Sequence, residues 1–171
     1  MKKQIFIIDT SAILSGKPIQ LDNSSMVTTP AVSNELNPGG RDFRSFELLK
    51  EIGLLIYAPS KKAVNHVKKT AKKTGDETRL SIADIEILAL AIDINNESDK
   101  EATILTDDYS IQNVASKLNI QFQAFSQNGI TKKFKWVSRC QGCKRQFREP
   151  IKICPICGSI IKSSVLYKKK I

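Results

Sequence analysis

The chain has 171 residues, of which 41% are hydrophobic and 26% are charged. These proportions are typical of a soluble globular protein, and they exclude wholesale disorder and a collagen-like chain. The first apolar run, residues 5–8, ends at Asp9 and is too short for a secretory segment or a membrane span. We therefore expect a cytoplasmic protein that buries a core of its own.

Short apolar runs alternate with longer helical patterns over the first three quarters of the chain. The runs compatible with buried strands are residues 4–8, 26–29, 54–58, 102–105 and 120–124. Helices are predicted over residues 30–36, 44–52, 61–73, 81–92 and 110–118. Thr29 before Pro30 is a helix-start signal, and Ser81-x-x-Asp84 is the pattern of a capping box. Because strands and helices alternate, we predict an α/β fold with a parallel sheet covered by helices on both faces.

Charge is distributed unevenly along the chain. Residues 1–129 carry 15 Lys and Arg against 16 Asp and Glu, whereas residues 130–171 carry 12 Lys and Arg against the single acid Glu149. Like charges at this density repel one another unless a polyanion neutralises them. The pattern favours nucleic acid as partner, and a segment that only aids solubility is the alternative. The lysines of the 61–73 helix also have two interpretations: a solvated helix face, or a surface that contacts phosphates.

All four cysteines lie in the basic quarter, in two Cys-x-x-Cys pairs. They are Cys140, Cys143, Cys154 and Cys157. Two such turns can aim four thiolates at one tetrahedral ion and leave no position open for catalysis. The spacing therefore predicts a zinc ribbon with one structural Zn²⁺. Disulfides and a thioredoxin-like redox motif are weaker alternatives in a cytosolic protein.

Exclusion narrows the catalytic chemistry to carboxylates. His66 is the only histidine and lies in the lysine-rich helix, so a Ser–His–Asp or Cys–His arrangement has poor support. Ser15-Gly16-Lys17 ends like a phosphate-binding loop, but Pro18 stands where Ser or Thr is required. Carboxylates contribute most to catalysis at neutral pH by holding Mg²⁺ or Mn²⁺.

Acidic residues stand where the predicted strands end. Asp9 follows the first strand, and Asp107 and Asp108 follow the fourth; Glu35 and Asp84 lie in helices that border the same end of the sheet. Ligands of open α/β sheets bind beyond the carboxyl ends of the strands. Each acid also has a purely structural interpretation, as a cap, a turn residue or part of a solvated helix face. Only their joint placement favours a cation site.

These acidic segments resemble the motifs of PIN-domain nucleases. The segments are Phe6-Ile7-Ile8-Asp9-Thr10-Ser11-Ala12, Thr29-Pro30-Ala31-Val32 through Glu35, Ser81-Ile82-Ala83-Asp84 and Thr106-Asp107-Asp108-Tyr109. Ser110-Ile111-Gln112-Asn113-Val114 and a ribbon opening at Trp136 extend the resemblance over nearly the whole chain. Over this length the sequence is similar to the Nob-one endoribonucleases, which mature the 3′ end of small-subunit ribosomal RNA. The short length resembles the archaeal form of this family.

The resemblance implies a set of roles for particular residues. Asp9, Glu35, Asp84 and Asp108 match the metal-binding catalytic acids of the family, which hold Mn²⁺ or Mg²⁺. Asp107 is a further candidate, although that position need not be acidic, and Thr10 or Ser11 is expected to orient Asp9. The implied partners are precursor small-subunit rRNA and the pre-ribosomal small subunit, without a membrane; the oligomeric state is left open.

The expected organisation has four parts. These are a PIN-like nuclease domain over 1–125, a linker over 126–135, a zinc ribbon over 136–167 and a basic tail over 168–171. Basic residues of the ribbon and linker are predicted to bind RNA, namely Lys132, Lys133, Lys135, Arg139, Lys144, Arg145 and Arg148. Two other functions remain open: a toxin-type PIN ribonuclease, and a non-catalytic RNA-binding factor of ribosome assembly.

Overall fold

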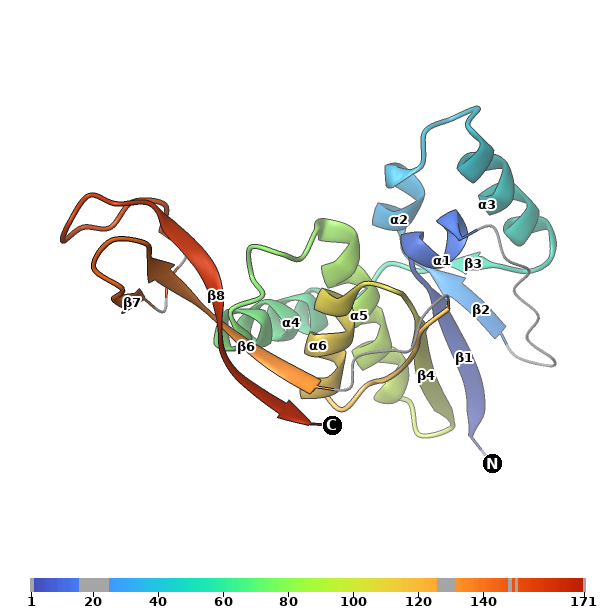
Figure 1. The fold of residues 1–171 in the computed structure, drawn as a ribbon. Coiled ribbons are helices and arrows are strands. Elements are labelled where there is room, and N and C mark those ends of the chain that lie inside the picture. The colour runs from blue at the N-terminus through green and yellow to red at the C-terminus, as the bar shows by residue number, and fades with distance from the viewer. Residues whose placement is uncertain (1, 16–24, 126–131, 148, 150, 171) are drawn as a thin grey trace.

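A computed structural model describes residues 2–15, 25–125, 132–147, 149 and 151–170 (Figure 1). Five parallel strands form the central sheet in the order β3-β2-β1-β4-β5. Their bounds are β1 (Lys3–Ile8), β2 (Ser25–Thr28), β3 (Leu55–Ile56), β4 (Lys100–Leu105) and β5 (Gln121–Gln123). The helices are α1 (Thr10–Leu14), α2 (Pro30–Glu35), α3 (Arg41–Glu51), α4 (Lys61–Thr74), α5 (Ile82–Asn95) and α6 (Tyr109–Lys117).

The core lies where β1 and β4 meet α5. Ile7, Ile8, Ile104 and Leu105 are almost fully buried in the two central strands. Helix α5 is apolar around most of its circumference, because it packs between the sheet on one side and the neighbouring helices α4 and α6 on the other. In Figure 1, α4, α5 and α6 gather on one side of the sheet, whereas α1, α2 and α3 lie near β2 and β3. The predicted parallel sheet flanked by helices is confirmed.

Local signals predicted the positions of most helices. The exceptions are the missing capping bond of Thr29 and the unpredicted helix α1. Ser81 and Asp84 form the predicted capping box at the start of α5. Thr29 occupies the N-cap position of α2, but its hydroxyl makes no capping bond. Glu86 of α5 accepts a hydrogen bond from the Ala31 amide instead, at 3.0 Å. The five-residue helix α1 was not predicted, since it is too short to show a helical period.

A second, antiparallel sheet follows in the order β7-β6-β8. It consists of β6 (Lys132–Cys140), β7 (Gln146–Phe147) and β8 (Ile161–Lys170). Residues 132–135 of the predicted linker and 168–170 of the predicted tail therefore belong to paired strands, while 126–131 lie outside the described residues. The domain boundaries themselves stay predictions. Strand β6 runs alongside α4 and α6 before it reaches the cysteines (Figure 1). Within the described residues, no helix has both the length and the hydropathy needed to cross a membrane.

Candidate active site and zinc centre

The strand order brings two predicted acidic segments together. The chain winds from β1 outward through β2 and β3, then returns to place β4 on the other side of β1. Ile8 pairs with Leu105 at the ends of β1 and β4. The residues that follow, Asp9 and Thr106, are therefore neighbours, and the Thr106 hydroxyl donates to Asp9 Oδ2 at 2.8 Å. This is the reversal point of the sheet, where open α/β folds bind their ligands.

Asp9 is a buried carboxylate held by hydroxyl groups. Its Oδ2 accepts hydrogen bonds from the Thr106 hydroxyl and from the hydroxyl and amide of Ser11, the latter two at 2.7 and 3.4 Å. Burial raises the pKa of Asp9, and the bonds from Ser11 and Thr106 partly offset that rise. All three of these bonds end on Oδ2, and the Thr10 backbone also hydrogen-bonds the carboxylate. The Ser11 hydroxyl thus orients Asp9, whereas the Thr10 hydroxyl donates to Glu35.

Glu35 and Asp84 are linked through Ser81. The Thr10 hydroxyl donates to Glu35 Oε2 at 2.7 Å, and the Ser81 hydroxyl donates to Glu35 Oε1 at 3.3 Å. The Ser81 amide donates to Asp84 Oδ2 at 2.7 Å. Helix α2 thus presents Glu35 to both the Asp9 turn and the start of α5. Sequence analysis identified Ser81 as a cap but not as the link between the two acids.

Asp107 and Asp108 have different surroundings. Asp107 Oδ1 accepts a hydrogen bond from the Phe125 amide at 2.7 Å, so this oxygen anchors the chain after β5. Asp108 is the N-cap of α6, and its Oδ1 accepts from the Ser110 amide at 2.6 Å. Asp108 is therefore a helix cap, whereas its structural interpretation from the sequence was a turn residue. We refer to Asp9, Glu35, Asp84 and Asp108 together as the acidic group.

The negative charges of three acids act on one another. The pKa of Asp84 is raised to about 6, chiefly because the side chain is half-buried, and also because Asp9 and Asp108 lie within electrostatic range. Carboxylates that repel in this way are suited to a divalent cation, which would be held by oxygen ligands. In the described part of the chain, the four carboxylates do not converge as tightly as the cysteines do. Hydroxyl groups of Thr10, Ser11, Ser81 and Thr106 lie between them.

Asp76 is a buried acid that sequence analysis missed. It follows Gly75, the left-handed residue that ends α4, and is fully buried. Its Oδ2 accepts a hydrogen bond from the Asn113 side chain at 2.7 Å, whereas its Oδ1 has no hydrogen-bond partner among the described residues. Burial raises the pKa of Asp76, and the charge of Asp108 contributes to the rise. The only sequence signal was the position of Asp76 directly after the glycine that ends a helix.

The raised pKa of Asp84 predicts that the metal-free protein becomes more stable as the pH falls from 7 to 5. The folded state takes up a proton near pH 6, whereas an unfolded aspartate does so near its ordinary value of 3.8. The stabilisation is therefore complete below about pH 4 and is lost as the pH rises through about 6. Partial exposure reduces it to about 1–2 kcal/mol, or roughly 3–6 °C in melting temperature.

Calorimetry of the metal-free wild type and of Asp84→Asn between pH 4 and 7.5 tests this expectation. The variant should lose this part of the pH dependence, while Glu101→Gln, an exposed acid on β4, should keep it. An identical pH profile in wild type and Asp84→Asn would contradict the assignment.

The four cysteines form a compact cluster at the end of the second sheet. Their sulfur atoms all lie within 4.8 Å of one another, and no disulfide joins them. The Cys140–Cys157 and Cys143–Cys154 Sγ distances are 3.3 and 3.7 Å. Around a tetrahedral zinc ion with Zn–S bonds of ~2.3 Å, neighbouring sulfur atoms are about 3.8 Å apart. The donor set and its geometry therefore fit one structural Zn²⁺.

The turns that carry the cysteines explain two sequence features. Lys144 and Gly158, each directly after the second cysteine of its pair, have positive φ angles of 61° and 69°. A Cβ atom on Gly142 would lie 2.4 Å from the Ser159 hydroxyl and 3.3 Å from the Cys157 sulfur, so a larger residue would require these side chains to shift. Hydrogen bonds from the Ser159 hydroxyl and amide lower the pKa of Cys157 to about 5, which favours the thiolate.

The structure describes the side chains of only some of the predicted RNA-binding residues. Arg139, Lys144 and Arg145 are exposed around the cysteine cluster. Lys132, Lys133 and Lys135 lie on β6, where only the backbone is described, and Arg148 lies outside the described residues.

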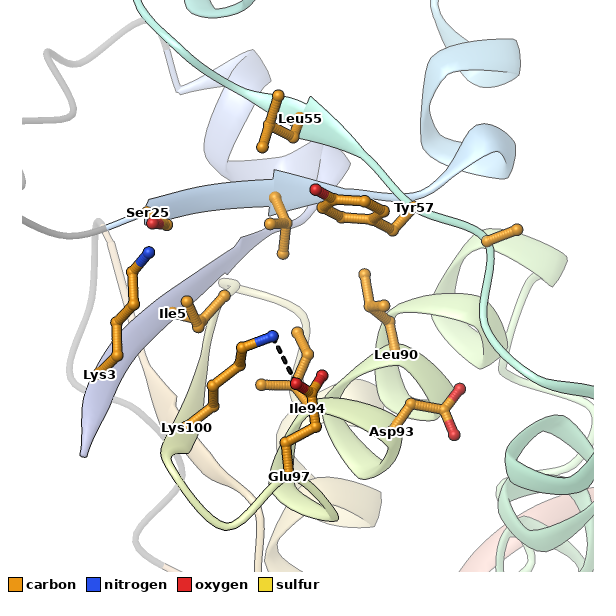
Figure 2. A pocket seen from close by; sticks show the side chains of 12 residues that line it. Lys3, Ile5, Ser25, Leu55, Tyr57, Leu90, Asp93, Ile94, Glu97 and Lys100 are labelled. Atoms are coloured by element: carbon orange, nitrogen blue, oxygen red, sulfur yellow. Dashed lines mark ion pairs between the residues drawn. The ribbon is translucent and has the colours of Figure 1, made fainter.

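A pocket of about 350 Å³ opens at the opposite end of the sheet (Figure 2). Lys3, Ser25 and Lys100, at the amino ends of β1, β2 and β4, line it, and Figure 2 shows Lys100 paired with Glu97. None of the five predicted catalytic acids lines this pocket. The acidic group is therefore separate from this pocket and lies at the carboxyl ends of the strands.

Comparison with known proteins decides the family. Residues 6–94 match the family described as the PIN domain of ribonuclease. The chain belongs to the PIN-domain ribonucleases. The matched range includes Asp9, Glu35 and Asp84, three of the predicted catalytic acids, and the prediction of an endoribonuclease is confirmed.

Relatives of this PIN-domain protein include several archaeal proteins. It is 38% identical to Endoribonuclease Nob1 of Archaeoglobus fulgidus, over 91% of this chain and 88% of the relative. It is 37% identical to Endoribonuclease Nob1 of Pyrococcus abyssi, over 91% of each chain. Ribonuclease VapC1 of Thermoplasma acidophilum is 40% identical over 92% of this chain and 77% of its own. These matches are too long to be confined to the α/β part, so they include part of the zinc-ribbon region.

A solved structure supports the fold of the PIN domain. The structure of VapBC-1 from nontypeable Haemophilus influenzae aligns with a TM-score of 0.51 and 20% identity, over 72% of this chain and 99% of the other. At this identity the likeness concerns the fold alone.

Proposed function

We propose that this chain is a metal-dependent endoribonuclease that cleaves precursor small-subunit (16S-type) rRNA at its 3′ end during ribosome biogenesis. The observation that carries the proposal is the combination of the acidic group at the reversal point of a PIN sheet with a four-cysteine ribbon on the same chain. Four archaeal relatives named Endoribonuclease Nob1 match 91–95% of the chain, which supports this combination as one functional unit.

We assign the cation ligands to Asp9, Glu35, Asp84 and Asp108. A bound Mn²⁺ or Mg²⁺ would supply an activated water for in-line attack on a phosphodiester and charge stabilisation for the leaving 3′ oxygen. The protein positions the ligands: Ser11 and Thr106 hold Asp9 by its Oδ2, while Thr10 and Ser81 hold both oxygens of Glu35. Asp107 is a positioning residue in this proposal: its position need not be acidic in the family, and its Oδ1 fixes the chain after β5 by accepting a hydrogen bond from the Phe125 amide.

The RNA partner is supported by the charge of the ribbon region. Residues 130–171 carry 12 basic residues against one acid, and a four-thiolate zinc site leaves that region strongly positive. We propose precursor rRNA, within the pre-ribosomal small subunit, as the substrate. A cytoplasmic location agrees with the reduced cysteine cluster that zinc requires.

The proposal is tested with a precursor rRNA fragment that spans the mature 3′ end. With Mn²⁺ or Mg²⁺, we expect one cut that leaves a 3′-hydroxyl and a 5′-phosphate, because attack by water does not need the 2′-hydroxyl. Mapping both product ends identifies the site. A fragment of equal length from the interior of the rRNA serves as control and should stay intact. A 2′,3′-cyclic phosphate end, or equal cleavage of both fragments, would overturn the proposal.

A toxin-type ribonuclease is a second candidate, because the relative from Thermoplasma acidophilum carries the name Ribonuclease VapC1. The same pair of fragments separates the two functions. A toxin-type enzyme would be indifferent to the mature 3′ end, whereas a maturation enzyme requires it. A non-catalytic assembly factor would bind the precursor fragment and leave it uncut whether Mn²⁺ or Mg²⁺ is present.

A further inference from the structure

Helix α4 has a strongly one-sided distribution of charge. Ala63, Val67, Ala71 and Thr74 are buried against the rest of the domain. All six lysines of the helix are exposed: Lys61, Lys62, Lys68, Lys69, Lys72 and Lys73. We call these six residues the α4 lysine face. The helix contains no acidic residue, and in the described part of the chain none of the six lysines forms an ion pair.

Most of these charges do not stabilise the isolated helix; only Lys72 and Lys73, in the last turn, interact favourably with its dipole. Lys68 and Lys72, and likewise Lys69 and Lys73, are four residues apart and repel across one turn. Lys61 and Lys62 lie in the first turn, where the helix dipole disfavours positive charge. An ordinary solvated helix carries acids at such positions. A polyanionic partner removes both unfavourable effects at once.

The neighbouring hairpin repeats the pattern. The β6–β8 register pairs Lys132 with Lys170 and Lys133 with Lys169, so residues of like charge stand opposite each other in the antiparallel ladder. Strand β6 contacts both α6 and α4 as it passes them (Figure 1). Two basic elements that are far apart in the sequence therefore lie side by side.

The α4 lysine face also leads toward the acidic group. Helix α4 ends at Gly75, and the next residue, Asp76, is bonded to Asn113 of α6. Asp108 caps the N-terminal end of helix α6. The loop after Asp76 continues to Ser81 and Asp84 at the start of α5. An RNA strand bound along α4 would thus lie between the β6–β8 hairpin and the proposed cation ligands.

We propose that the α4 lysine face binds the phosphate backbone of the RNA substrate and, with the β6–β8 hairpin, forms one continuous basic tract beside the acidic group. The inference rests on the proposed function for the identity of the RNA. The contacts are to phosphates, so they add affinity and set the path of the strand, but they do not read sequence. The lysines of α4 span about 18 Å along the helix, enough for several phosphates.

The experiment compares two variants, each of which loses four positive charges. The test variant replaces Lys68, Lys69, Lys72 and Lys73 by Gln. The control variant replaces Lys2, Lys3, Lys50 and Lys100, which lie outside α4, by Gln. Affinity for a labelled precursor rRNA fragment is measured without divalent metal over a range of salt concentrations, and melting temperatures are recorded alongside.

We expect the test variant to bind RNA on the order of 10- to 100-fold more weakly and to lose about two to three from the slope of log affinity against log salt. Its melting temperature should hold or rise, because repulsion within the helix is relieved. The control variant should keep the wild-type slope. With metal, the test variant should raise KM and keep kcat at saturating RNA, as expected for a residue set that binds substrate without contacting the reacting atoms.

Two results would overturn the inference. One is an unchanged affinity and salt slope in the test variant, which would confine RNA to the ribbon and assign the α4 lysine face to another class of partner. The other is an equal loss in both variants, which would reflect net charge alone. Because binding is measured without metal, a wild type that binds RNA through α4 but never cleaves it would overturn the proposed function and leave this inference standing.

Discussion

Replacing Asp9 by Asn is expected to reduce cleavage of the precursor rRNA fragment at least a thousandfold while RNA affinity stays within about twofold of wild type. The amide oxygen of Asn can take the place of Oδ2 and keep the bonds from Ser11 and Thr106. The amide nitrogen then occupies the position of Oδ1, and it cannot bind a cation. The basic tract is untouched, so binding and chemistry should separate. Cleavage assays and RNA titrations on the same preparation measure both effects.

The metal-free stability of Asp9→Asn gives an independent control. The variant removes a charge that burial disfavours and that raises the pKa of Asp84, so its melting temperature should hold or rise. Asp9→Ala removes the cap of α1 together with the charge, and the loss of the cap should lower stability by about 0.5–2 kcal/mol relative to Asp9→Asn. Glu101→Gln, which neutralises an exposed acid on β4, should leave cleavage unchanged. Wild-type cleavage by Asp9→Asn would defeat the catalytic assignment.

Replacing Cys157 by Ser is expected to unfold the ribbon and release its zinc, while the α/β sheet stays folded. The buried apolar cluster of the ribbon consists of Cys140, Cys154 and Ile161, with Phe147 and Ile151 partly buried beside it. So small a core cannot offset the entropy of ordering the ribbon, whereas a structural zinc site contributes about 10–16 kcal/mol. The wild type should contain one zinc ion per chain by elemental analysis, and the variant close to none.

Hydrogen exchange locates the change. In wild type, the amides of Cys140 and Cys154 donate to the carbonyl oxygens of Arg145 and Ser159, both at 2.9 Å, and they should be protected. In Cys157→Ser this protection should disappear, while amides of the sheet core around Ile7 and Ile104 keep theirs, because the two cores are separate clusters. Ser163→Ala, an exposed change on β8, is the matched control. A fully protected, zinc-free ribbon would exclude a structural metal.

Local patterns in the sequence were enough to predict most elements and both candidate sites. Five strands and five helices were predicted close to their observed positions, since hydrophobic periodicity and capping residues act over a few neighbouring positions. The clustering of the four cysteines was predicted from their spacing, because two Cys-x-x-Cys turns can bring four sulfur atoms around one ion. The assignment of Asp9, Glu35, Asp84 and Asp108 as cation ligands stays a prediction, which the sequence supports through their positions near the ends of strands and helices.

The tertiary structure decided how these pieces act together. Nothing local shows that β4 pairs with β1, yet that pairing is what places Thr106 against Asp9, 97 positions away in the chain. The bond between Ser81 and Glu35, the buried Asp76 and the approach of β6 to α4 are likewise products of packing. Sequence periodicity reports which face of an element is buried, because that depends on neighbouring side chains. Which element covers that face depends on strand order and chain connection, and only the folded chain specifies those.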